Sequence, residues 1–302
     1  MRFARGTDGV DVRNAAMDWL TRNSDLRVDY VFASTFEYEG HRLPLLDRQR
    51  GIRKPAGFDA ALAIRTTFTP PNQVPPYNDA IGSDGLQRYK YRGDNPDHHE
   101  NIALRRAYEQ NLPLIWFVGV APGLYESLFP VWIIADSPER LEFTLALDPV
   151  QRIMNPAAIT DSDTRRYVEQ ITKRRLHQRI FRSQVMLAYE TQCSVCCLKH
   201  DSLLDAAHII PDGSPRGEPI VSNGLTLCKI HHAAFDASIL GIRPDLTLHI
   251  RRDILAEHDG PMLRHGLQEM HNKRLMKLPD TRAARPDRER LEERYAHFLS
   301  AG

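Results

Sequence analysis

The stretch from residue 193 to residue 232 reads CSVCCLKHDSLLDAAHIIPDGSPRGEPIVSNGLTLCKIHH and decides how the C-terminal part of the chain folds. Cys193 and Cys196 form a C-x-x-C pair, and Cys228 and His231 form a C-x-x-H pair. Together they offer the Cys₃His donor set of a tetrahedral zinc site. A lone C-x-x-C pair would also suit a redox disulfide, but a second pair at this separation favours structural zinc.

Three further polar residues of this stretch, His208, Asn223 and His232, are not needed by a zinc site. Their order, His then Asn then His threaded through a zinc frame, resembles the HNH (ββα-metal) nucleases. The Ala-Ala-His-Ile sequence that ends with Ile209 resembles a recognised subgroup of that family. The resemblance covers roughly residues 182–252, and it implies a hairpin that carries His208, a loop that carries Asn223 and a helix that carries His232. His208 taken alone would also suit a core histidine.

The resemblance implies a role for each of these residues in cutting DNA by a one-metal mechanism. His208 would be the general base that takes a proton from the attacking water, because the pKa of histidine lies near neutral pH. Asn223 would orient the imidazole, and His232 would bind one divalent cation, Mg²⁺, Mn²⁺ or Ni²⁺. The C-x-x-H spacing assigns His231 to zinc, which leaves His232 for the catalytic ion.

One position departs from the commonest HNH pattern. Ala207 stands where many members have an acidic residue or a histidine as a second ligand of the catalytic ion. Asp205 lies two residues earlier, and on a strand it would project from the same face. Asp236 lies one helical turn after His232 and is the other candidate ligand. A surface or capping role is the alternative for both aspartates.

Length and composition fit a globular protein with two domains. The chain has 302 residues, of which 42% are hydrophobic and 26% charged. Four cysteines, three of them assigned to zinc, indicate a reducing cytoplasm, and no apolar run approaches the roughly twenty residues of a membrane span. The net charge of +1 means that binding of nucleic acid must depend on local basic patches.

The pattern changes near Asp148-Pro149, which predicts three parts: residues 1–150, a basic linker helix over 151–184, and a nuclease domain with a C-terminal helical buttress over 185–302. The first part is rich in short β-type runs and predicts a β-barrel of an α+β class. The expected strands are residues 30–33, 63–68, 114–120, 131–134 and 142–147. The expected helices are residues 11–22, 101–110 and 287–300.

The linker between the two domains is strongly basic. Residues 165–182 read RRYVEQITKRRLHQRIFR, with apolar residues at three-to-five-residue steps, which predicts an amphipathic helix with a basic face. Lys173, Arg174 and Arg175 lie at its centre. This face would lie along DNA phosphates, and a solvated linker helix is the alternative.

The order of residues in the first domain resembles the SRA-type readers of modified bases in the PUA superfamily. It runs through Tyr77-Asn78-Asp79, a Tyr-rich run at residues 83–93, and the Asn-led run at 101–106. Such a reader flips a modified base into a pocket and stacks it between aromatic rings. Candidate pocket residues are Phe36, Tyr77, Asp79, Tyr89 and Tyr91, and candidate phosphate contacts are Arg48, Arg50, Arg53, Lys54, Arg88 and Arg92. A barrel core is the alternative for the alternating aromatic residues.

Taken together, these resemblances predict a modification-dependent DNA restriction endonuclease that acts on double-stranded DNA carrying modified cytosine. An HNH nuclease that reads unmodified sequence or a sulfur-modified backbone, and a non-catalytic zinc module that binds DNA, are the alternatives. Because one HNH site cuts one strand, a homodimer on DNA is expected. Its candidate interface residues are Val168, Ile171 and Leu176 of the linker and Leu291, Tyr295, Phe298 and Leu299 of the last helix.

Overall fold

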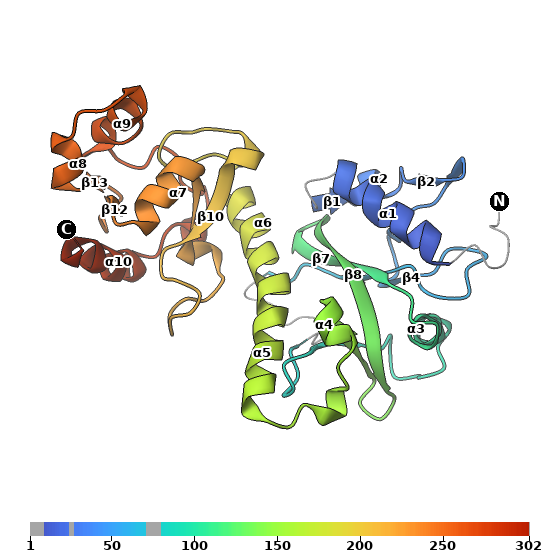
Figure 1. The fold of residues 1–302 in the computed structure, drawn as a ribbon. Coiled ribbons are helices and arrows are strands. Elements are labelled where there is room, and N and C mark those ends of the chain that lie inside the picture. Colours follow the sequence, from blue (N-terminus) through green and yellow to red (C-terminus); the bar gives the residue numbers. More distant parts are fainter. Residues whose placement is uncertain (1–8, 24–26, 71–79, 302) are drawn as a thin grey trace. The chain divides into compact units, whose positions relative to one another are not determined.

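The computed structural model describes residues 9–23, 27–70 and 80–301. The chain divides into two compact units, residues 1–180 and 181–302 (Figure 1). Each unit has its own hydrophobic core. None of the described helices is long and apolar enough to cross a membrane.

The N-terminal unit is built on a mixed sheet. Its strand order is β4-β5-β7-β8-β9-β6, with β1 paired to the first residues of β8, and among the described strands the β5–β7 pair alone is parallel. The strands are β1 (Arg27–Asp29), β4 (Ile52–Arg53), β5 (Ala63–Thr66), β6 (Gln87–Lys90), β7 (Leu114–Ala121), β8 (Leu124–Ser137) and β9 (Glu142–Ala146), and a separate hairpin joins β2 (Glu37–Tyr38) to β3 (His41–Arg42). This curled half-barrel sheet with helices confirms the expected α+β class.

One helix covers each face of this sheet. Successive residues of a strand point to opposite sides, so each strand contributes side chains to both cores. Ile115 and Phe117 of β7 pack in the core that contains α1 (Val10–Asn23). Leu114 and Trp116 pack in the core that contains α3 (His99–Glu109). Both helices follow the apolar periodicity of the sequence and confirm the helices predicted at residues 11–22 and 101–110.

The prediction of a strand at residues 30–33 was wrong. Tyr30–Ala33 form a short helix, α2, because the Asp29 carboxylate accepts a hydrogen bond from the Phe32 amide at 2.7 Å and caps the turn. The β-type composition of these four residues gave way to this local cap. The strands expected at 63–68, 114–120, 131–134 and 142–147 correspond to β5, β7, β8 and β9.

The basic stretch after the sheet is helical, as predicted. Helix α4 (Pro149–Arg152) and the turn at Pro156–Ala158 lead into α5 (Ser162–Thr172), a π-helical turn (Lys173–His177) and α6 (Gln178–Ala188), which follow one another directly. Val168, Thr172 and Leu176 are buried, whereas Lys173, Arg174 and Arg175 are exposed. The helix is therefore amphipathic in the sense that the sequence indicates.

The C-terminal unit is a small hairpin and helix with a further helical layer (Figure 1). Strand β10 (Leu204–His208) pairs with β11 (Gly224–Cys228), and α7 (Lys229–Asp236) follows directly. The remaining elements are the pair β12 (Leu240–Ile242) and β13 (Leu248–Ile250), the helices α8 (Arg252–Ala256), α9 (Pro261–Gly266) and α10 (Arg288–Ser300), and the 3₁₀ turns Asp201–Leu203, Val221–Asn223, Gln268–Met270 and Arg282–Ala284.

Candidate active site and zinc centre

Four side chains of the C-terminal unit converge on one point. One donor atom from each of Cys193, Cys196, Cys228 and His231 lies within 4.8 Å of the other three. His231 Nδ1 lies 3.1 Å from Cys228 Sγ and 3.5 Å from Cys193 Sγ. Within the part of the chain that the structure describes, no other group of three or more Cys, His, Asp or Glu donors is gathered so tightly. This donor set fits a tetrahedral zinc ion.

A second contact fixes the tautomer of His231. Its Nε2 lies 2.7 Å from the carbonyl oxygen of Gly266, and a carbonyl can only accept a hydrogen bond. Nε2 must therefore carry the hydrogen, which leaves the lone pair of Nδ1 directed at the cysteines. Such outer contacts orient metal-binding histidines in many proteins. Gly266 lies at the end of α9, well outside the stretch that the spacing of the ligands singles out.

His208 stands at the end of β10, opposite Gly224 in the hairpin. Its ring stacks on Phe181 with centroids 4.0 Å apart, and its buried Nε2 has no hydrogen-bond partner among the residues that the structure describes. Burial lowers the pKa of His208 below its usual value, an effect that the charge of Asp212 opposes. A neutral imidazole with a free ring nitrogen is the state that a general base requires.

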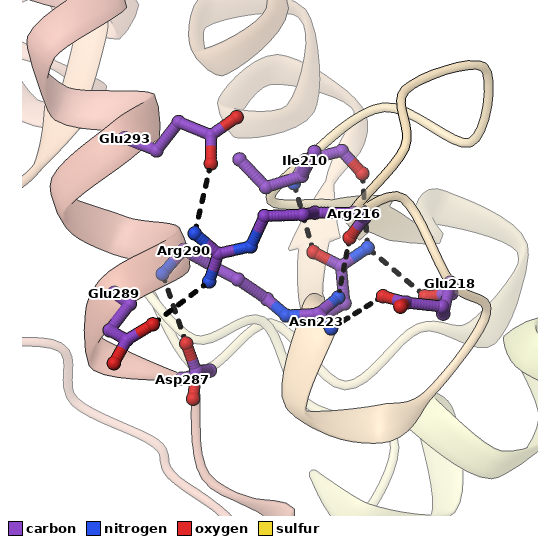
Figure 2. A network of polar contacts seen from close by, with 8 residues as sticks. All are labelled: Ile210, Arg216, Glu218, Asn223, Asp287, Glu289, Arg290 and Glu293. Atoms are coloured by element: carbon purple, nitrogen blue, oxygen red, sulfur yellow. Dashed lines mark hydrogen bonds and ion pairs between the residues drawn. The ribbon is translucent and has the colours of Figure 1, made fainter.

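Asn223 is completely buried and ties together the two ends of the loop between β10 and β11. Its Oδ1 accepts a hydrogen bond from the Ile210 amide at 2.9 Å. Its Nδ2 donates to the carbonyls of Ile210 at 3.0 Å and Glu218 at 3.1 Å (Figure 2). The Ile209 amide also donates to the Asn223 carbonyl at 2.9 Å. These bonds hold the residues directly after His208.

His232 lies on α7 between two carboxylates. Its Nδ1 is 3.2 Å from Asp205 Oδ2, and its Nε2 is 3.3 Å from Asp236 Oδ2. Burial would raise the pKa of Asp205, but hydrogen bonds from Lys229 and His232 outweigh that effect and lower it. The Lys229 ammonium lies 2.6 Å from Asp205 Oδ1. Asp205 is thus an ionised acceptor held by two neighbours, whereas Asp236 is exposed.

The structure places several residues of the predicted base pocket in the core of the N-terminal unit. Phe36 and Tyr91 are each 2% exposed, and Tyr89 is 5% exposed. The Tyr89 hydroxyl contacts the carbonyls of Gly51 and Arg65, and the Tyr91 hydroxyl bonds to Asp136. Their burial agrees with the alternative interpretation of the alternating aromatic residues, in which they form the core of the unit. Tyr77 and Asp79 lie outside the described residues.

The basic residues considered for phosphate contacts, in the first domain and in the linker, fall into two groups. Arg88 is held by Asp84 and Glu142, and Arg53 and Lys54 bond to backbone carbonyls, so these three are engaged within the unit. The second group is exposed: Arg48, Arg50, Arg92, Lys173, Arg174 and Arg175. Of these, Arg50 and Arg92 approach the buried carboxylate of Glu100, at 3.6 and 2.7 Å.

The apolar residues considered for a dimer interface are mostly used inside their own units. Val168, Leu176, Leu291 and Phe298 are buried, and Leu299 is 55% exposed. The Tyr295 hydroxyl lies 2.7 Å from His249 Nδ1. The periodic apolar faces of both helices therefore reflect packing within the units.

Sequence reasoning missed three kinds of residue near the site. Phe181 covers the His208 ring, and only its position in the apolar period of the linker could have indicated its burial. Gly224 allows a close approach, because a Cβ there would lie 2.4 Å from Val185 and 3.0 Å from the Phe181 ring. Arg216 and Arg290, which hold the loop after His208, have no local signal at all.

Comparison with known proteins identifies part of this unit. Residues 193–243 match the family model of an HNH endonuclease. No curated protein matches the chain. Among solved structures the chain is similar to a modification-dependent TagI restriction endonuclease, at 17% identity over 82% of this chain and 85% of that chain, with a TM-score of 0.32. Dependence on modification is a property of that protein, and a similarity this low does not extend it to this chain. Residues 193–243 are thus an HNH endonuclease domain, and the protein that carries it is a DNA endonuclease.

Proposed function

We propose that His208 is the general base of a phosphodiester hydrolysis in DNA. Its Nε2 would take a proton from a water molecule, whose oxygen attacks phosphorus while the bond to the 3′ oxygen breaks. The observation that carries this proposal is the buried Nε2 of His208, which lacks a hydrogen-bond partner in the described part of the chain, on a hairpin whose loop Asn223 holds. Burial keeps this imidazole neutral near pH 7 by lowering its pKa.

The residues around His232 suit a hard divalent cation. Asp205 is an ionised acceptor 3.2 Å from Nδ1, so Nδ1 donates to it, and Nε2 lies 3.3 Å from Asp236 Oδ2. A lone pair and a carboxylate at this distance repel one another unless a proton or a cation lies between or near them. We therefore assign Nε2 of His232 and Asp236 to the cation, and Asp205 to holding the His232 ring.

A bound Mg²⁺, Mn²⁺ or Ni²⁺ would neutralise charge on the phosphate and stabilise the leaving oxygen. The charges of His232 and Asp236 both act on the pKa of His208, which means that all three groups face the same region of the unit. The position of Asp236 beside Nε2 of His232 supports Asp236, rather than Asp205, as the ligand that replaces the acidic residue missing at Ala207.

We also propose that the N-terminal unit reads a modified base, with modified cytosine as the expected target. The support is the order of the Tyr-rich run at residues 83–93 and the Asn-led run at residues 101–106, which resembles SRA-type readers. Exposed Lys173, Arg174 and Arg175 offer charge for phosphates, although Lys173 and Arg175 also pair with Glu169 and Asp148 at 2.7 and 2.8 Å. With Tyr89 and Tyr91 in the core, we expect other side chains to stack on the base.

Cleavage of plasmid DNA tests both proposals in one design. Wild-type protein and His208→Ala are incubated with Mg²⁺ or Mn²⁺ and with plasmid that is unmodified or carries methylated or hydroxymethylated cytosine. We expect wild-type protein to cut modified plasmid faster and His208→Ala to cut neither. Equal cutting of all plasmids would refute the reader and leave the nuclease standing. Cutting by His208→Ala at the wild-type rate would refute the general base.

A double-strand break needs two active sites or two successive nicks, and we propose that two copies of the chain act together on DNA. Most of the apolar residues named above are buried within their own units, so the contact between copies would use mainly other surfaces. Light scattering of His208→Ala with a cognate duplex measures the number of chains bound. One chain per duplex, together with linear product from the wild type, would show sequential nicking instead.

A further inference from the structure

The loop between β10 and β11 is held on its outer side by the last helix of the chain (Figure 2). Arg290 of α10 donates to the Arg216 carbonyl at 2.7 Å and approaches Glu218 Oε2 at 2.5 Å. The Asp287 amide, at the start of the same helix, donates to the Ser222 carbonyl at 2.9 Å. These contacts join α10 to the loop that begins directly after His208 and ends at Asn223.

Arg290 and Asn223 share one contact partner, Glu218. Glu218 takes the Arg290 guanidinium on its side chain and accepts the Asn223 Nδ2 hydrogen on its backbone carbonyl. The Arg290 side chain is only 11% exposed, so this pair is shielded from solvent on one side. By contrast, the ion pairs of Arg216 with Glu289 and Glu293 are exposed and contribute little on their own.

The next turn of α10 holds the other half of the site. Arg294 lies four residues after Arg290, and it donates to the Phe235 carbonyl at 2.7 Å with its guanidinium 4.6 Å from the Phe235 ring centre. Phe235 precedes Asp236 at the end of α7, the helix that carries His232. One face of α10 therefore contacts both the loop after His208 and the helix of His232.

We propose that α10 is a positioning element of the nuclease, in which Arg290 fixes the His208 loop and Arg294 fixes α7. This inference rests on the proposed roles of His208 and His232. Neither arginine is catalytic, since each acts through backbone and side-chain contacts at the rear of the loop and helix. A general base that is displaced by about 1 Å can lose about a hundredfold in rate, so a loose loop is costly even when the fold survives.

The test compares variants on the same helix. Arg290→Gln removes the guanidinium charge, Arg290→Lys keeps the charge but not the two-pronged contact, and Arg288→Gln is the control. Arg288 is 80% exposed, and within the described residues its ion pair is with Glu292, four residues later on the same helix. Glu218→Gln removes the negative charge from the same contact and leaves the backbone carbonyl that Asn223 uses.

Two measurements separate positioning from general destabilisation. Hydrogen exchange followed by mass spectrometry should show faster exchange in residues 209–223 of Arg290→Gln, with residues 193–200 unchanged and zinc retained. Single-turnover cleavage should slow by about tenfold or more with unchanged DNA affinity, less so for Arg290→Lys, and not for Arg288→Gln. Glu218→Gln should follow Arg290→Gln in both measurements.

Other results would overturn the proposal. Unchanged exchange in residues 209–223 of both Arg290→Gln and Glu218→Gln would show that the contact does not order the loop. Faster exchange throughout the C-terminal unit, with loss of zinc, would make Arg290 a residue of general stability. If the wild type and Arg288→Gln cleave no DNA, the proposed function fails, and the exchange measurement still decides whether α10 holds the loop.

Discussion

Replacing Asn223 with aspartate tests how much the buried amide contributes to the C-terminal unit. The two side chains have nearly the same volume, and a carboxylate still accepts the hydrogen bond from the Ile210 amide. An ionised carboxylate has no hydrogen to donate, so the bonds to the carbonyls of Ile210 and Glu218 are lost. Asn223→Asp therefore removes two of the three side-chain bonds without opening a cavity.

The cost follows from where the two carbonyls lie. The bond between Asn223 and the Ile210 carbonyl is buried, so leaving that carbonyl unpaired costs about 1–3 kcal/mol. Glu218 is an exposed residue, and its carbonyl can bond to water instead. Loss of the hydrogen bond to the Glu218 carbonyl therefore costs about 1 kcal/mol. We expect the free energy of unfolding of the C-terminal unit to fall by about 2–4 kcal/mol at pH 7.

The loss should depend on pH. Desolvation raises the folded-state pKa of a buried carboxyl, and its protonated form can donate one hydrogen bond again. Stability relative to wild type is then greatest below the unfolded pKa of about 3.9 and falls as the pH rises through the folded-state value. We therefore expect the defect of Asn223→Asp at pH 8 to be at least as large as at pH 6.

Two probes report on the two units separately in a urea titration. All three tryptophans, Trp19, Trp116 and Trp132, belong to the N-terminal unit, so their fluorescence follows that unit. Release of zinc to a coloured chelator follows the C-terminal unit. For Asn223→Asp, the zinc-release midpoint should move to lower urea and the fluorescence midpoint should not move.

The control is Asn272→Asp in the same unit. Asn272 is exposed, and its Oδ1 accepts a hydrogen bond from Arg243 at 3.1 Å, which an aspartate can accept equally well. Its zinc-release midpoint should match that of the wild type. The reasoning about the buried amide is refuted if Asn223→Asp releases zinc at the same urea concentration as Asn272→Asp.

Three further predictions concern the metal sites and the base. Cys193→Ser should lose zinc and unfold the C-terminal unit, because zinc binding supplies folding free energy; wild-type protein without bound metal would contradict this. Since burial lowers the pKa of His208, the acid limb of single-turnover cleavage should be centred below pH 6.5, and an acid limb centred above pH 6.5 would argue against His208 as the base. Asp236→Asn should raise the Mn²⁺ concentration for half-maximal cleavage by about tenfold or more, and Asp205→Asn should raise it less; the reverse order would exchange their roles.

Much of the C-terminal unit could be predicted because its signals are local. The C-x-x-C and C-x-x-H pairs each lie within one turn of the chain, so their spacing alone indicates which donors can share an ion. The order of His208, Asn223 and His232 resembles a known nuclease pattern, and residues 193–243 match that family. The amphipathic linker and the last helix were predicted from apolar periodicity for the same reason.

The N-terminal unit was less predictable. Aromatic residues that alternate along a strand suit both a ligand pocket and a core, and only the paired sheet shows that Tyr89 and Tyr91 face inward. The run Tyr30–Ala33 has β-type composition, but the Asp29 cap makes it a helix. In both cases the conformation or the burial depends on contacts with residues outside the short run whose composition was considered.

By itself, the sequence indicated the four candidate metal ligands, the order of His208, Asn223 and His232, and the class of chemistry, because those depend on residue types at short, fixed spacing. Only the tertiary structure decided which nitrogen of His231 faces the cysteines, which aspartate faces Nε2 of His232, and that Arg290 holds the loop of His208. Arg290 and the Arg216 carbonyl are 74 residues apart in the chain, and His231 and the Gly266 carbonyl are 35 apart. Such contacts form only when separate elements pack together, and no periodicity or spacing within either element encodes them.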